Sequence, residues 1–310
     1  MSLDPRVRRF LDFLAAGNPP DAREATVEER RLGLTELMKL AGPEAAVGAV
    51  ADRRIPGPGG TLAVRIYSPP NAAALEPALV YFHGGGMVAG TLATHDSIAR
   101  ALAHYGAVRV VSVDYRLAPE HRFPAALDDA LAAVHFISAN AAALGIDALR
   151  LGVCGDSAGG TLAAVTCQAA ARTGSPHLAL QLLICPILDY SRLTASRRDL
   201  GSGYLIDQAT LDHDLMHYLP AGVETSNPLV SPALADDLNG IPRTLIHTAE
   251  FDPLRDEGRN YFSSLTRARV EVSYTCHPGM IHLFYGLGSV IPYARTAFEQ
   301  IGAEIRAALA

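Results

Sequence analysis

A chain of 310 residues is long enough for one large α/β domain with a sizeable core, or for two smaller domains. Its composition, 49% hydrophobic and 19% charged, excludes intrinsic disorder, and its net charge of −6 gives no general attraction to nucleic acid or anionic membranes. No apolar run reaches the roughly 18 residues of a membrane span, and no signal peptide is evident. We therefore expect no nucleic-acid partner and no stable membrane insertion.

The cysteines are widely spaced and form no Cys-x-x-Cys motif; they are Cys154, Cys167, Cys185 and Cys276. Such a pattern indicates buried, reduced thiols and not a disulfide framework. Together with the missing signal peptide, it leads us to expect a cytoplasmic protein.

Residues 1–45 show helical spacing of apolar side chains, in a first group around Val7, Phe10 and Leu14 and in a second around Leu34. Between the two groups, residues 18–21 read Asn-Pro-Pro-Asp and interrupt the pattern. We predict two N-terminal cap helices in residues 1–45, ahead of a catalytic domain that spans residues 46–310.

From residue 47 onward, strand patterns begin and then alternate with helix patterns. Residues 47–55 and 61–67 predict a hairpin, because residues 56–60 read Pro-Gly-Pro-Gly-Gly. The alternation predicts an α/β fold with a mostly parallel central sheet, covered by helices on both faces. The further strands are expected at 78–82, 108–113, 149–154, 178–184, 244–248 and 269–276, and the helices at 95–105, 124–143, 158–172, 254–267 and 291–309.

The alternation is interrupted once, between residues 184 and 244. A stretch of roughly sixty residues is too long for an ordinary connection, and it contains a helical pattern near residues 208–218. We interpret about 187–230 as an inserted cap segment that packs with the N-terminal helices. The cap would cover the carboxyl ends of the strands, where ligands bind in open α/β sheets.

Residues 155–159 read Gly-Asp-Ser-Ala-Gly at the junction of a predicted strand and a predicted helix. A serine on such a sharp turn is held in a strained conformation with its hydroxyl exposed, and the flanking positions come too close together for side chains. The helix N-terminus that follows favours negative charge. The pattern predicts that Ser157 is a nucleophile.

A second glycine motif follows strand 78–82, where residues 83–86 read His-Gly-Gly-Gly. Consecutive glycines let backbone N–H groups point into a cavity, where they stabilise the oxyanion of a tetrahedral intermediate. A phosphate-binding loop would instead need a G-x-G-x-x-G motif or a P-loop lysine, and neither is present. The motif therefore predicts an oxyanion loop.

Four motifs occur in the same order as in a known family: residues 83–86, residues 114–121 (Asp-Tyr-Arg-Leu-Ala-Pro-Glu-His), residues 155–160 and residues 252–257 (Asp-Pro-Leu-Arg-Asp-Glu). In these motifs the chain resembles the hormone-sensitive-lipase-like esterases, the bacterial family IV carboxylesterases. The resemblance covers nearly the whole chain. It implies an α/β-hydrolase core with a helical cap, and hydrolysis of short- to medium-chain carboxylic esters without a cofactor.

The resemblance also implies roles for the residues beside the nucleophile. It assigns the oxyanion donors to Gly85, Gly86 and Ala158. His83 and Gly84 are expected to support the loop, His83 by hydrogen bonding and not by proton transfer.

Hydrolases of this fold carry their catalytic triad in the order serine, acid, histidine. The acid is expected after strand 244–248, where Asp252 lies in a loop directly before a proline. Glu250 and Asp256 are the alternatives, and Asp256 falls one turn into the next predicted helix. We predict that Asp252 orients the catalytic histidine and stabilises its charged form.

The base is expected after the last strand, where His277 and His282 both qualify. His277 is predicted at the strand end, whereas His282 lies further along, in a loop that can turn back over Ser157. The resemblance also favours His282. The family usually has glycine at the next position, where this chain has Leu283.

The expected substrate pocket rests on loop position and on the resemblance alone; its candidates are Met87, Tyr204, Leu205, Ile281 and Leu283.

His213 and His217 are four residues apart on a predicted helix and superficially resemble the H-E-x-x-H zinc motif. Aspartate stands in place of the glutamate there, and no third ligand follows. We therefore expect no metal and no cofactor, and we interpret both histidines as cap residues that are solvated or line the entrance.

A serine carboxylesterase that acts through an acyl-enzyme on a small-molecule ester is the leading hypothesis. The same triad would serve an amidase, a lactonase or a thioesterase. A ligand-binding protein without catalysis is a further alternative, and the presence of His282 argues against it. A homodimer is possible through strand 269–276.

Overall fold

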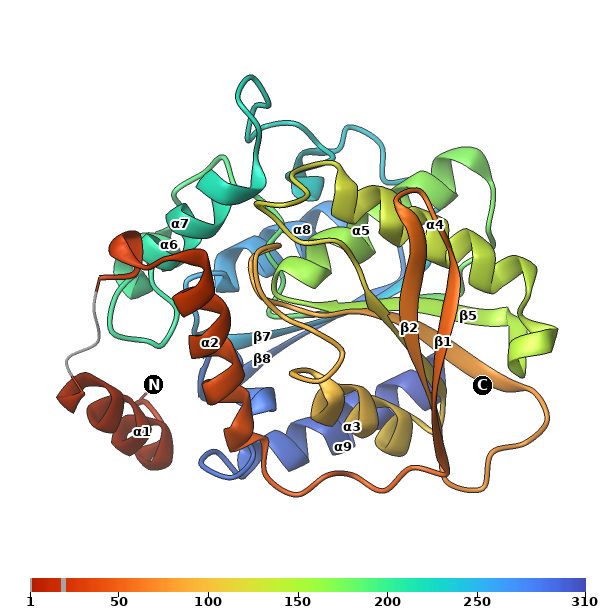
Figure 1. Cartoon of the computed structure of the whole chain (residues 1–310), viewed down its shortest axis with the longest axis horizontal. Coiled ribbons are helices and arrows are strands. Elements are labelled where there is room, and N and C mark those ends of the chain that lie inside the picture. The colour runs from red at the N-terminus through yellow and green to blue at the C-terminus, as the bar shows by residue number, and fades with distance from the viewer. Residues whose placement is uncertain (1, 18–20) are drawn as a thin grey trace.

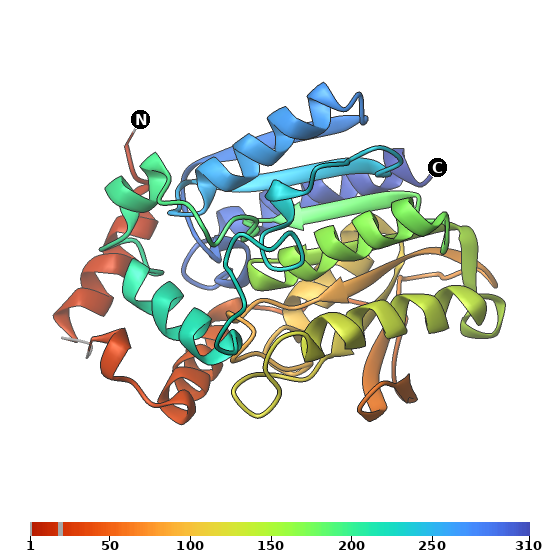
Figure 2. The same cartoon turned by 90° about the horizontal axis from the view of Figure 1, so that it is seen from above.

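The structure, a computed structural model, describes residues 2–17 and 21–310. Residues 18–20, which carry most of the expected interruption, lie outside the described part. The described part contains a twisted sheet between two layers of helices, with a group of smaller helices at one end (Figure 1, Figure 2).

The sheet has eight strands in the order β1-β2-β4-β3-β5-β6-β7-β8. β1 and β2 form the predicted antiparallel hairpin, β2 also pairs antiparallel with β4, and the remaining pairs are parallel. This confirms the mostly parallel sheet. The strands are β1 Ala49–Gly57, β2 Gly60–Ser68, β3 Glu76–Phe82, β4 Arg109–Asp114, β5 Ile146–Asp156, β6 Leu180–Ile184, β7 Arg243–Phe251 and β8 Val272–Ile281.

Helices cover both faces of the sheet (Figure 1). α3 (Asp96–Gly106) packs beside α9 (Tyr293–Ala308) on one face, and α4 (Ala125–Ala139), α5 (Ala158–Thr173) and α8 (Arg255–Arg267) lie on the other. Because the central strands are buried on both faces, the core is divided into two clusters, one on each side of the sheet.

The smaller helices come from two distant parts of the sequence and lie side by side (Figure 2). We call them the two-part cap: α1 Pro5–Ala16, η1 Ala22–Glu24 and α2 Val27–Met38 from the N-terminus, and α6 Ala195–Leu200 and α7 Gln208–Tyr218 from the insertion. α2 begins with a capping box between Thr26 and Glu29. The expected helix near 208–218 is present, whereas α6 has no counterpart in the sequence prediction.

Several element boundaries differ from the prediction by a few residues, and the largest differences are at the end of β8 and the end of α4. β8 continues to Ile281, because it stays paired with β7 through a register shift between Ala249 and Phe251. His277 therefore lies within β8 and not at its end. The helix expected over 124–143 ends at Ala139, and a short 3-10 turn, η3 (Ala142–Leu144), follows.

β8 is an edge strand of the sheet, and the expected homodimer through this strand stays a prediction.

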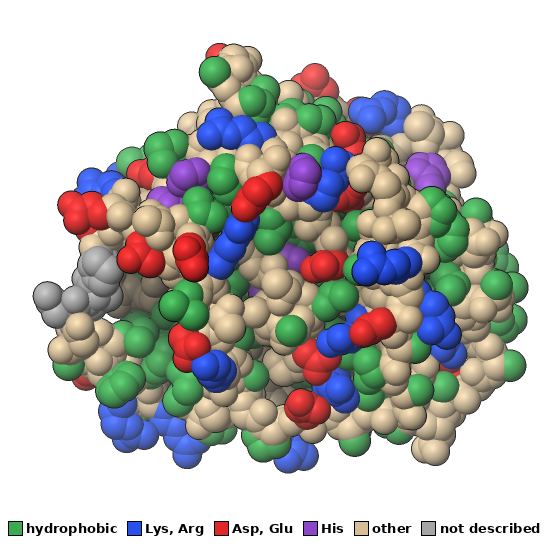
Figure 3. Space-filling model, in the orientation of Figure 1, with side chains coloured by type: hydrophobic (Ala, Val, Ile, Leu, Met, Phe, Trp, Pro, Cys, Tyr) green, Lys and Arg blue, Asp and Glu red, His purple; other side chains and the backbone are tan. Residues whose placement is uncertain are grey.

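None of the described helices combines the length and apolar character that crossing a membrane requires. Lys and Arg side chains are interspersed with Asp and Glu side chains over the face shown in Figure 3.

Candidate active site

Ser157 lies at the tight turn between β5 and α5. Its backbone has φ 52° and ψ −121°, a conformation that costs a non-glycine residue strain. A Cβ atom on Gly155 would lie 2.0 Å from the carbonyl oxygen of Gly159, and one on Gly159 would lie 2.0 Å from the carbonyl oxygen of Phe82. The close approach that the sequence pattern predicts is therefore present, and only glycine fits at either position.

A chain of hydrogen bonds connects Ser157 to a histidine and an aspartate. The Ser157 Oγ lies 3.1 Å from His282 Nε2, and His282 Nδ1 lies 2.8 Å from Asp252 Oδ2. The second carboxylate oxygen of Asp252 accepts a hydrogen bond of 2.8 Å from the Leu254 backbone N–H. All three side chains of the chain are buried, so their relative positions are set by packing.

The alternative residues are engaged elsewhere. His277 contacts His247 and the Tyr293 hydroxyl, and burial lowers its pKa to about 3, so it stays neutral. Asp256 accepts a hydrogen bond from the Ser196 backbone N–H. Glu250 accepts one from the backbone N–H of Gly279, in β8.

Leu283, directly after His282, adopts a left-handed conformation with φ 61°. This is the position where the family usually has glycine. The backbone turn is therefore the one that glycine would adopt, and leucine adopts it at a cost of roughly 1 kcal/mol.

The glycine loop after β3 lies beside Ser157. Gly85 and Gly86 have φ values of 119° and 67°, which side-chain-bearing residues rarely adopt. A Cβ atom on Gly85 would lie 2.2 Å from the Ala89 carbonyl oxygen, and one on Gly86 would lie 1.9 Å from Asp214 Oδ2. Among the described residues, no acceptor takes a hydrogen bond from the N–H group of Gly85 or Gly86.

His83 supports this loop through hydrogen bonds and ring stacking. Its Nδ1 lies 2.8 Å from the Gly84 carbonyl oxygen, and its own carbonyl oxygen accepts a hydrogen bond of 2.7 Å from the Tyr115 hydroxyl. The His83 ring stacks on the rings of His95 and Tyr115. Burial lowers the pKa of His83 to about 3, so the ring is neutral and acts as part of the scaffold.

Asp156, which precedes the nucleophile, ties the two glycine motifs together. Its carboxylate accepts hydrogen bonds from the Gly84 N–H at 3.0 Å, the Tyr81 hydroxyl at 2.5 Å and the Tyr285 hydroxyl at 3.0 Å. Burial raises the pKa of Asp156. Neither tyrosine stands out in the sequence, because each looks like an ordinary apolar core residue in its own segment.

Comparison with known proteins identifies the family of this chain. The profile of a protein family described as having the α/β-hydrolase fold matches residues 79–286. Carboxylesterase NlhH of Mycobacterium tuberculosis is 39% identical over 316 residues, which cover 99% of this chain and 96% of that protein. The chain belongs to the hormone-sensitive-lipase-like family of carboxylesterases. It is therefore an enzyme of the carboxylic-ester-hydrolase class.

Two further relatives support the assignment to this esterase family. Ethyl acetate hydrolase of Pseudomonas putida is 38% identical over 304 residues, which cover 95% of each chain. The solved structure of an ester hydrolase from the metagenome of Lake Arreo, in complex with a bipyridine phosphonate derivative, superposes with a TM-score of 0.95. It is 39% identical and covers 98% of each chain.

A cavity of about 600 Å³ opens above Ser157 and His282 in this esterase. The oxyanion loop forms part of its floor, and the two-part cap forms its walls through apolar side chains that include Leu34, Leu37 and Leu211. The cavity is mostly apolar, with a few charged side chains from α2 and α7. Such a space suits a substrate with an apolar group on the ester.

Two of the five expected pocket residues, Leu205 and Leu283, line this cavity, and the other three lie elsewhere. Met87 has φ 65° and is fully buried in the core, since the tight glycine loop turns it inward. Ile281 is packed in the core at the end of β8. Tyr204 stacks on the ring of Phe251, with ring centroids 5.6 Å apart.

Of the two histidines of α7, His217 is partly exposed, whereas His213 is not the solvated or entrance-lining residue that was expected. His213 is buried, its Nε2 lies 3.0 Å from the Ala25 carbonyl oxygen, and its Nδ1 lies 3.2 Å from Asp214 Oδ1. His213 thus joins the two halves of the cap. Its ring nitrogens are directed at protein groups and not at the solvent or the entrance.

In the described part of the chain, a metal-compatible group is formed by Cys185, Asp252 and His282, whose ligand atoms lie within 4.8 Å of one another. Two of these three side chains already bond to each other, and His282 also contacts Ser157. These two side chains thus belong to the hydrogen-bond chain that ends at Ser157, and the buried Cys185 thiol lies beside it.

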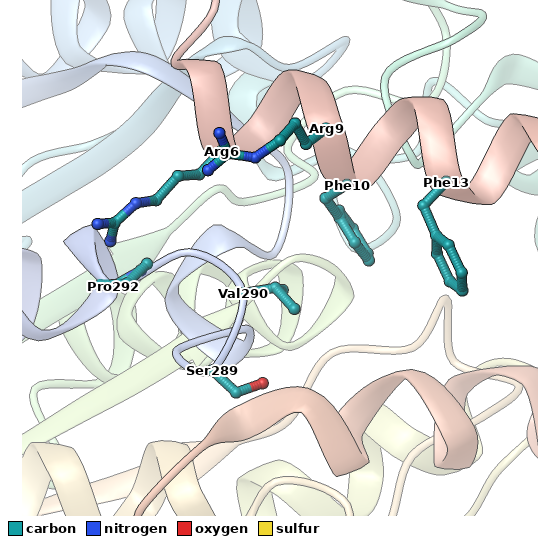
Figure 4. Close-up of a pocket in the computed structure, with 7 residues that line it drawn as sticks. All are labelled: Arg6, Arg9, Phe10, Phe13, Ser289, Val290 and Pro292. Carbon is teal, nitrogen blue, oxygen red and sulfur yellow. The ribbon is translucent and has the colours of Figure 1, made fainter.

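A second cavity, of about 380 Å³, lies between α1 and the segment that precedes α9. Figure 4 shows Arg6, Phe10 and Phe13 projecting from α1 toward this segment, whereas the Arg9 side chain lies along α1. Its lining includes none of the residues expected for catalysis.

Proposed function

We propose that the chain is a serine carboxylesterase in which Ser157 is the nucleophile, His282 the general base and Asp252 the group that orients the histidine. The observation that carries the proposal is the hydrogen-bond chain from Asp252 through His282 to Ser157. It ends at the floor of a largely apolar cavity, where an ester can reach the serine hydroxyl.

In the first half of the reaction, His282 Nε2 takes the proton from Ser157 as the serine oxygen attacks the ester carbonyl. The carbonyl oxygen becomes an oxyanion, which accepts hydrogen bonds from the N–H groups of Gly85, Gly86 and Ala158. The tetrahedral intermediate then expels the alcohol, which takes its proton from His282. An acyl group remains on Ser157.

In the second half, water attacks the acyl-enzyme while His282 takes a proton from it. The second oxyanion uses the same donors. Its collapse releases the carboxylic acid and returns the proton to Ser157. Asp252 keeps the His282 Nδ1 as a donor throughout and stabilises the imidazolium form.

Three features support the assignment of the oxyanion donors. Gly85 and Gly86 line the cavity beside Ser157. Their N–H groups have no acceptor among the described residues. Ala158 is the first residue of α5, where the helix dipole favours a negative charge.

For the substrate, we propose esters with short to medium acyl chains. A cavity of about 600 Å³ with walls from the cap limits the length of the chain. The names of the relatives, among them ethyl acetate hydrolase, favour esters over amides, lactones or thioesters. A cytoplasmic location is part of the proposal, and the four cysteines, all free, support it.

The test replaces the nucleophile. Ser157→Ala should lower kcat for p-nitrophenyl butyrate by roughly 10⁵-fold or more, because the acyl-enzyme cannot form. A fluorophosphonate probe should label the wild-type protein at Ser157, as identified by peptide mass spectrometry, and should not label the variant.

Ser263→Ala is a matched control, since this hydroxyl bonds only within α8, to the Arg259 carbonyl oxygen. It should keep full activity. Full activity in Ser157→Ala would overturn the mechanism. A series of p-nitrophenyl esters from acetate to palmitate tests the substrate, and a preference for palmitate would contradict the proposed chain length.

A further inference from the structure

The cavity above Ser157 contains an ion pair between the two halves of the cap. Arg30 of α2 contacts Asp214 of α7 with both ends of its guanidinium, Nε to Oδ1 at 3.1 Å and Nη2 to Oδ2 at 2.8 Å. The side chains of Arg30 and Asp214 are only 17% and 5% exposed. Both line the cavity. This pair is therefore part of the surface that a substrate meets.

The pair lies directly over the oxyanion loop. A Cβ atom on Gly86 would lie 1.9 Å from Asp214 Oδ2, so the carboxylate of Asp214 packs against the backbone of a proposed oxyanion donor. Charge at this position acts on the reacting part of the substrate at short range. It acts in a buried site, where electrostatic interactions are stronger than in water.

The remaining charged groups of the cavity offer no free cation to a substrate. Arg30 is the only lysine or arginine among the described lining residues. Glu29 accepts the backbone N–H of Thr26, and Glu36 pairs with Lys39 at 2.6 Å. The cavity wall thus presents three carboxylates from the cap and one guanidinium, whose donors already point at a carboxylate.

His213 is a titratable group that contacts the pair directly. Its Nδ1 lies 3.2 Å from Asp214 Oδ1, and its Nε2 is directed at the Ala25 carbonyl oxygen. The His213 ring therefore helps to fix the position of the Asp214 carboxylate, and neither of its nitrogens is directed into the cavity. Asp214 in turn is the group that neutralises Arg30.

We propose that Asp214 determines the charge specificity of the site: by neutralising Arg30 above the oxyanion loop, it makes the enzyme reject esters that bear a second carboxylate. The inference rests on the proposed function, because it assigns a substrate class to the same cavity. Removing one member of a buried ion pair leaves the other charge uncompensated. A substrate carboxylate would supply that compensation, so Asp214→Asn should convert a repelled substrate into an accepted one.

The experiment compares two esters of similar length, the mono-p-nitrophenyl ester of adipic acid and p-nitrophenyl hexanoate, with spontaneous hydrolysis subtracted. The measured quantity is the ratio of kcat/KM for the anionic ester to kcat/KM for the neutral ester. Asp214→Asn should raise this ratio roughly tenfold or more over wild type, mainly through a lower KM for the anionic ester. The double variant Arg30→Gln with Asp214→Asn should lose the gain, because it has no guanidinium.

Asp52→Asn is the matched control. Asp52 also binds an arginine with both carboxylate oxygens, Arg65 at 2.6 and 3.0 Å, but on the exposed hairpin, so this variant changes the net charge equally without touching the cavity. Its ratio should equal that of wild type. An unchanged ratio in a folded Asp214→Asn that still hydrolyses the hexanoate would overturn the inference and leave the triad proposal intact.

A second variant covers the case in which Asp214→Asn does not fold, as judged by thermal unfolding. Leu37→Lys places an unpaired cation on the same wall, where Leu37 is half-buried, and leaves the ion pair in place. It should also raise the ratio, and an unchanged ratio would overturn the inference. A wild-type protein that is not labelled by fluorophosphonate would instead contradict the proposed function.

Discussion

At the residue scale, several residues with positive φ values lie close to the proposed catalytic residues. Ser157, Leu283 and Gly86 all have positive φ values, as does the buried Cys185. Each such conformation in a non-glycine residue costs roughly 1–3 kcal/mol, and it persists only where the surrounding structure enforces it. Here a buried strand ends shortly before each of these positions and supplies that enforcement, so strain is stored where the geometry must be held.

Gly86 is the position where the requirement for glycine beside Ser157 can be tested. Gly86→Ala should lower kcat by roughly 10²–10³-fold, because a methyl group would collide with Asp214 and displace a proposed oxyanion donor. Steady-state kinetics with p-nitrophenyl butyrate measures the effect, and KM should change less than kcat.

Gly174→Ala separates the collision from the backbone strain. Gly174 has φ 72°, close to the 67° of Gly86, but a Cβ atom there would meet nothing within 4 Å. This control should lose about 1 kcal/mol of stability and keep its kcat. An equal kcat in Gly86→Ala and wild type would show that Gly86 is not part of the oxyanion site.

At the scale of elements, one arginine ties α2 to the catalytic core by hydrogen bonds. Arg31 donates to the carbonyl oxygens of Val88 at 2.9 Å and Ala118 at 3.0 Å, and to Glu120 at 2.8 and 2.6 Å. Both carbonyl groups belong to loops that follow strands of the sheet. The position of the cap wall relative to Ser157 therefore depends on polar contacts as well as on apolar packing.

Arg31→Ala should loosen α2 without unfolding the core. We expect a loss of about 1–2 kcal/mol, because two carbonyl groups and a carboxylate lose a donor. Hydrogen exchange should become faster in α2, and KM should rise while Ser157 remains reactive toward a fluorophosphonate probe.

The control is Arg295→Ala, which removes an exposed pair with Glu299 within α9. Its effect should stay below about 0.5 kcal/mol. Protection of α2 at the wild-type level in Arg31→Ala would mean that apolar packing alone holds the cap.

At the scale of the whole molecule, stability is tied to histidines that are buried in the neutral form. Burial lowers the pKa of His83, His95 and His277 from 6.5 to about 3. Between these values the unfolded chain binds more protons than the folded protein. The stability is therefore fully present above pH 6.5 and is lost as the pH falls toward 3.

The free energy of unfolding should consequently fall between pH 7 and pH 5, by about 2 kcal/mol for each of the three histidines. His277→Gln should lose about 2 kcal/mol less than wild type over this interval. Urea unfolding at the two pH values measures both slopes.

His135→Gln, a change at an exposed position of α4, should behave as wild type does. An identical loss of stability in His277→Gln and wild type would contradict the assignment of a lowered pKa to His277. In that case the histidine would not be held neutral in the folded protein.

Much of this architecture could be predicted from the sequence, for a physical reason. The alternation of apolar patterns depends on residues close together in the chain, and so does the strand-to-helix turn around Ser157. The mostly parallel sheet, the glycine requirement at 155 and 159 and the helix α7 were all predicted on this basis. The glycine spacing reflects a steric requirement, the close approach of backbone segments at the turn, which involves only a few neighbouring residues.

Only the tertiary structure decided which distant side chains meet. It brings His282 and not His277 to Ser157, because β8 continues past His277 to Ile281. It turns Met87 into the core and away from the cavity, and it joins Arg30 to Asp214 across 184 residues. Such contacts depend on how complete layers pack, and no local pattern records them. The proposed nucleophile was therefore predictable from five residues, whereas the ion pair above it was not.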